Sequence, residues 1–140
     1  MFITRECDYA VRVIRALAGE TRLSVSEICE REKITAPFAY KILKKLQKAK
    51  IVKGFRGVYG GYSLNQEVSQ LNLYDVYHAI DPDLFIIECM QPGYSCVRNG
   101  EDGKMCEVHQ ELEEIQDEMW KLLKRKKLDE LLEEKKDNTP

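Results

Sequence analysis

Three cysteines and one histidine lie close together in the second half of the chain, in the order Cys89-x6-Cys96-x9-Cys106-x2-His109. Thiolate and imidazole are soft ligands that bind transition metals and iron–sulfur clusters. Cys106 and His109 are three residues apart at the start of a predicted helix, so both side chains can face the same point. These four residues form a candidate metal or cluster site.

The elements around this site are a long loop and a long helix. Residues 81–105 contain two prolines and three glycines, which predicts a loop, and a loop of this length in a compact domain is usually functional or disordered. The helix is expected from about Met105 to Lys126, followed by a further short helix with Leu128 and by a frayed tail. Its apolar residues follow the heptad spacing of a helix that packs against another helix: Val108, Leu112, Ile115, Met119 and Leu122.

The first eighty residues predict four helices and one hairpin. A helix over residues 4–18 has Thr4 as its cap, and a capping box at Ser24–Glu27 opens a second helix through about Arg31. Thr35 caps a third helix, which turns Phe38, Ile42, Leu43 and Leu46 inward and its lysines largely outward. Strands at 51–53 and 62–64 flank a glycine-rich turn, and Asn72 caps a helix over 73–80.

Two short helices joined by a turn and followed by a hairpin form a winged helix-turn-helix, a DNA-binding module. From Lys33 to Arg56 there are eight Lys or Arg and no Asp or Glu, although the net charge of the chain is −2. Lysines there would contact phosphates, and Arg56 at the wing tip would enter a narrow minor groove. The expected DNA contacts are Thr35, Ala36, Pro37, Phe38, Tyr40, Lys41, Lys44, Lys45, Arg56, Gly57 and Tyr59.

Two of these assignments have alternatives. A lysine-rich helix can simply face solvent, and Phe38 can equally belong to the core. Cys7 and Cys29 fall on apolar helix faces and are most simply small buried hydrophobic residues.

Composition excludes several classes of protein. The chain is 44% hydrophobic, enough for a folded core in one domain, and it has no apolar run of the ~20 residues that span a membrane. The N-terminus does not resemble a signal peptide, so we expect a cytoplasmic protein whose cysteines are thiols or ligands. The sequence shows no nucleophile–base pair, phosphate loop or paired carboxylates, so we do not expect an enzyme.

Several segments together resemble the Rrf2 family of bacterial transcription regulators: residues 2–12, residues 34–46, Arg56-Gly57-x2-Gly60-Gly61-Tyr62-Ser63-Leu64 and the loop cysteines. The resemblance implies a mainly α fold with a small β-hairpin. It also implies a homodimer through the long C-terminal helix, residues 106–126, that binds double-stranded operator DNA. The parts would be a DNA-binding domain at 1–80, a cysteine loop at 81–105, and a dimerisation helix with its tail at 106–140.

The three loop cysteines point to the cluster-binding branch of that family, whose members sense iron–sulfur, redox or nitric oxide conditions. Cys89, Cys96 and Cys106 would be thiolate ligands. His109 as the fourth ligand corresponds to a [2Fe-2S] cluster, which we favour. Asp8 supplied by the partner subunit corresponds to a [4Fe-4S] cluster. The gaps between the cysteines are longer here than is usual in the family.

Simpler interpretations stand beside these. Asp8 precedes Arg12 by four residues, the spacing of a surface ion pair, and His109 can be a solvated helix residue. Zinc accepts three cysteines and a histidine, although no two of these cysteines are closer than seven positions. A thiol–disulfide switch needs no metal. A cluster-free regulator, thiol- or zinc-dependent, would act through a protein partner.

Overall fold

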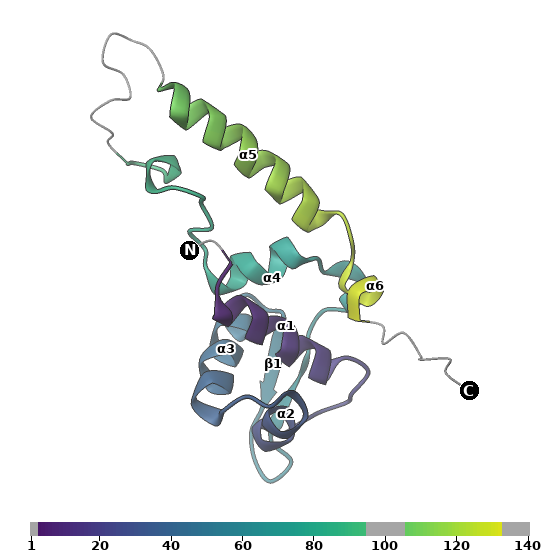
Figure 1. The fold of residues 1–140 in the computed structure, drawn as a ribbon. Helices are drawn as coiled ribbons and strands as arrows, with labels where there is room; N and C mark the ends of the chain where they lie inside the picture. The colour runs from purple at the N-terminus through teal and green to yellow at the C-terminus, as the bar shows by residue number, and fades with distance from the viewer. Residues whose placement is uncertain (1–2, 95–105, 133–140) are drawn as a thin grey trace.

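The computed structural model describes residues 3–94 and 106–132, and within them it is mostly helical with one antiparallel hairpin, as predicted. Most of the helices form a head, and one long helix stands apart from it (Figure 1). The elements are α1 (Arg5–Leu17), α2 (Val25–Glu32), α3 (Ala36–Lys48), β1 (Val52–Phe55), β2 (Gly61–Leu64), the 3-10 turn η1 (Val68–Gln70), α4 (Leu73–Ile80), the 3-10 turn η2 (Glu88–Met90), α5 (Glu107–Lys124) and α6 (Leu128–Leu132).

The core of the head lies between α1, α2, α3 and α4, and α1 contacts the other three. Each helix has one apolar face, and burial of that face removes apolar surface from water, the main stabilising contribution to such a domain. The largest side chains with no solvent exposure include Ile14, Leu17, Ile28, Leu43 and Leu46.

Capping boxes explain the starts of α2 and α4. Ser24 and Asn72 each form a capping box, with Glu27 and Asp75 as the reciprocal partners. Thr4 and Thr35 occupy the expected N-cap positions, but neither side chain makes a capping bond. The Thr4 hydroxyl lies 3.6 Å from the sulfur of Cys7 instead.

The hairpin is longer than expected and is joined to the turn before α2. β1 and β2 pair from Val52 opposite Leu64 to Phe55 opposite Gly61. Leu23 forms an isolated antiparallel bridge with β2, because its N–H and carbonyl both bond to Tyr62, at 2.9 and 2.8 Å. A Cβ on Gly61 would lie 2.4 Å from the Leu23 carbonyl oxygen, and Gly61 has φ +148°, so this close approach requires glycine.

α5 contacts the head through α4, and α6 then folds back onto η1 (Figure 1). α5 ends at Lys124 and not at Lys126, since the chain must turn there for Leu128 to reach the core. Leu128 has no solvent exposure, and its N–H donates to the Leu71 carbonyl at 2.8 Å. None of the described helices is long and apolar enough to cross a membrane.

Candidate ligand site and DNA-binding surface

Two of the predicted ligands meet at the start of α5. Cys89 lies in η2, and its sulfur is 3.2 Å from Nδ1 of His109, in the first turn of α5. Cys106 is the N-cap of that helix, three residues before His109. All three are half-buried. Cys96 lies outside the described residues.

A pocket of about 420 Å³ adjoins this pair. Phe85, Met90 and Trp120 contribute apolar walls, and Gln116, Asp117 and Glu113 contribute polar ones. Glu113 lies one turn after His109, with its carboxylate 3.8 Å from Nε2, which is ion-pair range and longer than a hydrogen bond. The site is therefore a recess between the loop and α5 rather than an exposed patch.

The donor chemistry of the pair fits a metal or cluster. One sulfur and one imidazole nitrogen converge, and both are ligand types that iron–sulfur clusters and zinc accept. Across residues 3–94 and 106–132, no three His, Cys, Asp or Glu side chains converge into a metal-binding group. The described part of the site thus supplies two converging donors, with Cys106 one turn away.

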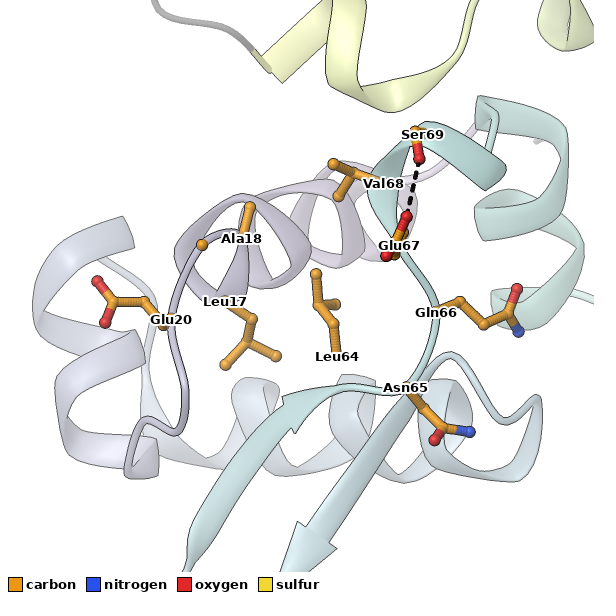
Figure 2. A pocket seen from close by; sticks show the side chains of 10 residues that line it. Leu17, Ala18, Glu20, Leu64, Asn65, Gln66, Glu67, Val68 and Ser69 are labelled. Carbon is orange, nitrogen blue, oxygen red and sulfur yellow. Dashed lines mark hydrogen bonds between the residues drawn. The ribbon is translucent and has the colours of Figure 1, made fainter.

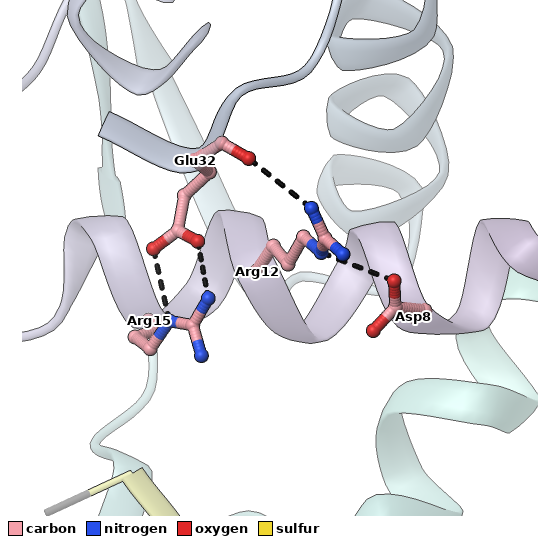
Figure 3. Close-up of polar contacts among 4 residues, drawn as sticks. All are labelled: Asp8, Arg12, Arg15 and Glu32. Carbon is pink, nitrogen blue, oxygen red and sulfur yellow. Dashed lines mark hydrogen bonds and ion pairs between the residues drawn. The ribbon is translucent and has the colours of Figure 1, made fainter. Parts of the chain in front are cut away.

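Asp8 lies in a different network, drawn in Figure 3. Its carboxylate is 3.0 Å from Nε of Arg12, as the four-residue spacing predicted, and the Asp8 side chain is 57% exposed. Arg12 also donates to the backbone carbonyl of Glu32 at 3.3 Å, and the buried Glu32 carboxylate accepts two bonds from Arg15. This network ties α1 to the end of α2, directly before the turn into α3.

The N-terminal turn of α3 presents the predicted DNA-contacting residues to solvent. Thr35, Ala36, Pro37 and Tyr40 are all exposed. The expectation that Phe38 points inward was wrong, because it is 41% exposed and packs edge-on against Tyr9 with ring centroids 5.5 Å apart. Ala39 is buried in its place, while Ile42, Leu43 and Leu46 are buried as expected.

Two of the predicted phosphate-contacting lysines already have a partner. Lys41 and Lys45 pair with the two carboxylate oxygens of Glu6 on α1, at 2.5 and 2.8 Å. Hydrogen bonds from Lys41 first, and then Lys45, hold the pKa of Glu6 below its usual value. Lys44, between them in the sequence, is exposed. No sequence pattern pointed to Glu6, since it lies thirty-nine residues before Lys45.

The wing tip is exposed and has its own brace. Arg56 and Gly57 are exposed, and so is Tyr59, at 82%. The guanidinium of Arg22 lies 4.0 Å from the centroid of the Phe55 ring and donates to the carbonyl oxygen of Tyr59. Sequence patterns did not identify Arg22, which belongs to the turn before α2.

A second hollow, of about 420 Å³, lies between the end of α1 and the chain after β2 (Figure 2). Leu17 and Leu64 form its floor, while Glu20, Gln66 and Glu67 surround it. These are carboxylates and amides without a sulfur or imidazole donor, so this hollow is chemically unlike the recess beside Cys89.

Comparison with known proteins identifies the family. The profile of the Rrf2 family, described as an iron-dependent transcriptional regulator, matches residues 3–134. Protein aau3 of Rhizobium meliloti is 32% identical over 95 residues, which are 66% of this chain and 62% of that protein. A putative HTH-type transcriptional regulator of Synechocystis, slr0846, is 36% identical over 87 residues, 60% of this chain and 59% of that one. The chain thus spans about three fifths of the length of these two relatives.

Solved structures share the fold. The global cysteine regulator CymR of B. subtilis superimposes with a TM-score of 0.70 at 20% identity, covering 94% of this chain and 96% of that chain. T. potens IscR gives 0.69 at 21% identity, covering 94% and 86%. With the winged head and the match over residues 3–134, the chain belongs to the Rrf2 family of DNA-binding transcriptional regulators, which are not enzymes.

Proposed function

We propose that this protein is a homodimeric transcription regulator that senses its surroundings through an iron–sulfur cluster bound by the loop before α5. It would act in the cytoplasm on genes of iron–sulfur, redox or nitric oxide response. The observation that carries the proposal is the contact of Cys89 with His109 on a loop attached to α5.

The residues that would hold the cluster are Cys89, Cys96, Cys106 and His109. A histidine in place of one thiolate removes a negative ligand and raises the reduction potential, which suits a [2Fe-2S] centre that responds to oxidants. Asp8 of the partner subunit is the alternative fourth ligand, with a [4Fe-4S] cluster. The [2Fe-2S] form is favoured because His109 already lies against Cys89, whereas Asp8 is engaged with Arg12.

DNA binding is assigned to α3 and the wing. The exposed residues at the start of α3 would read base edges in the major groove, and Lys44 with its neighbours would meet phosphates. Arg56 would enter the minor groove. Residues 1–80 would thus read DNA, residues 81–105 would hold the ligand, and residues 106–140 would join the subunits.

The homodimer would form through the heptad seam of α5. Val108 is 65% exposed, Ile115 40% and Leu122 59% in the single chain. Apolar side chains repeated along a helix and open to water are typical of a surface that a second helix covers. Since η2 packs on α5, a change in the loop would alter the spacing or tilt of the two DNA-binding domains in the dimer. Binding to DNA would respond only if the two states of the loop differ in DNA affinity.

Anaerobic purification tests the proposal. We expect a coloured protein that contains iron and acid-labile sulfide, with an absorption spectrum that Cys89→Ser abolishes. His109→Ala should change the spectrum if His109 is the fourth ligand, and Asp8→Ala should change it if Asp8 is. Colourless protein that carries zinc from anaerobic cells would contradict the cluster assignment.

A cluster-free regulator is the second candidate, because a thiolate beside an imidazole is also an ordinary zinc pair and an oxidisable thiol. It would work through a protein partner. In that case the anaerobic protein contains no iron or acid-labile sulfide, and its DNA binding responds to zinc removal or thiol oxidation, whereas the cluster proposal requires iron and sulfide in the protein.

A further inference from the structure

One face of α5 holds the segment that carries Cys89, residues 84–90. His109, Gln116 and Trp120 follow at intervals of seven and four residues, so they share a face of the helix, about a third of a turn from the heptad seam. Each of the three contacts the segment. The heptad seam, which we propose as the dimer interface, and the face that contacts residues 84–90 are therefore separate surfaces of α5.

Gln116 makes a hydrogen bond to the backbone of this segment. Its side-chain oxygen accepts from the N–H of Ile86 at 2.7 Å, and the residue is only 4% exposed. Ile86 is half-buried, and a backbone N–H that loses its acceptor away from water is costly, so this bond restricts the chain at Ile86. Cys89 follows three residues later, and three residues span at most ~10 Å, which limits where its sulfur can lie.

Trp120 secures the same segment from one turn further along. Its ring packs on Phe85 at a centroid distance of 6.1 Å and on Tyr74 of α4 at 5.6 Å. Leu84, just before Phe85, is 2% exposed. The segment is thus held between α5 and the head before it reaches Cys89.

We infer that Gln116 is a positioning residue for the ligand site, which holds Cys89 opposite His109 before any metal or cluster binds. The inference rests on the proposed function of the loop as a ligand site. Gln116 does not itself donate to the ligand. It restricts the freedom of a ligand-bearing segment, and a preorganised site binds more tightly because less order must be imposed on binding.

The experiment compares three variants with the wild type in anaerobic protein stripped of metal. Gln116→Leu removes the acceptor at similar size, and Gln116→Glu keeps an acceptor oxygen. Gln110→Leu makes the same substitution at an exposed position on another face of α5. Amide hydrogen exchange at Ile86 reports the bond, and titration with Co²⁺ alone, followed by its thiolate charge-transfer and d–d absorption, reports the ligand site.

We expect Gln116→Leu to speed exchange at Ile86 and to weaken Co²⁺ binding roughly fivefold each, the change that loss of one net hydrogen bond produces. Its absorption at saturating Co²⁺ should match the wild type, because the ligands are unchanged, whereas Cys89→Ser should alter it. Gln116→Glu should keep the slow exchange at Ile86, because an acceptor oxygen remains, and Gln110→Leu should behave as the wild type in both measurements.

Exchange at Ile86 or Co²⁺ affinity that is the same in Gln116→Leu and the wild type would overturn the positioning role alone. A changed saturating spectrum in Gln116→Leu would also overturn it, since Gln116 would then be a ligand. A wild-type protein that takes up no Co²⁺ would overturn the ligand site, and the inference with it.

Discussion

Glu6 on α1 forms ion pairs with two lysines of the predicted DNA-binding helix α3. Lys41 and Lys45 both pair with it, and the Glu6 side chain is 24% exposed. Glu6→Gln should strengthen DNA binding severalfold at low salt, because two cations become available to phosphates. The plot of log affinity against log salt concentration should become steeper, by up to the slope that about two additional phosphate contacts produce. Fluorescence anisotropy over a salt series measures both.

Glu130→Gln on α6 makes the same charge change on the element that packs against η1. It serves as the control and should leave the salt slope unaltered. Weaker binding by Glu6→Gln would show instead that Glu6 orients the lysines toward DNA.

The same carboxylate predicts a pH dependence of stability. Hydrogen bonds from Lys41 and Lys45 lower the pKa of Glu6 from its usual value of 4.5, so the folded state binds this proton less readily than the unfolded state. The stabilisation is therefore present above pH 4.5 and is lost as the pH falls through the lower folded value. Urea unfolding should find Glu6→Gln less stable than the wild type at neutral pH, and the difference should vanish in acid. A difference that persists in acid would contradict this.

The position of the wing, the hairpin of β1 and β2, depends on the turn before α2. Arg22, in the turn before α2, stacks on Phe55 and donates to Tyr59, so it fixes the loop that carries Arg56. Arg22→Ala should weaken operator binding severalfold, and much of that loss should disappear in an Arg56→Ala background. The coupling expected of two residues that act through one structure is about 0.5–3 kcal/mol.

A double-mutant cycle by anisotropy measures this coupling. Arg125→Ala, at the end of α5, is the matched control and should be additive with Arg56→Ala. Additive losses for Arg22 and Arg56 would mean that Arg22 contributes independently of the wing tip. Arg22→Lys should restore the loss only in part, because an ammonium lacks the planar guanidinium that stacks on the ring.

At the scale of the whole molecule, the exposed seam of α5 predicts assembly. The double variant Ile115→Glu with Leu122→Glu places charge on the seam and should convert a dimer to a monomer, with a large loss of operator affinity. Both side chains are at least 40% exposed in the single chain, so the fold should persist. Sedimentation equilibrium and circular dichroism measure the two properties.

Gln110→Glu adds one carboxylate at an exposed position away from the seam and should leave the dimer intact. A double variant that sediments as the wild type does would remove the seam from the interface.

Much of the fold could be predicted because its causes are local. The capping box at Ser24, the cap at Asn72, the bounds of α4 and the Asp8–Arg12 pair all depend on residues within one turn of each other. Phe38 could be assigned to the core or to the DNA-facing side, because periodicity shows that a helix has an apolar face, while the packing of α1 against α3 decides where the boundary of that face falls.

The sequence by itself determined the kinds of donor in the loop and the DNA-reading module that precedes it. Only the tertiary structure decided that Cys89 meets His109, twenty residues later, and that Glu6 faces Lys41 and Lys45. Helix periods and caps arise from bonds between residues three or four apart, whereas these contacts depend on how whole helices pack. The proposed role of Gln116 also depends on this packing, because its amide meets the N–H of Ile86 only once the loop lies against α5.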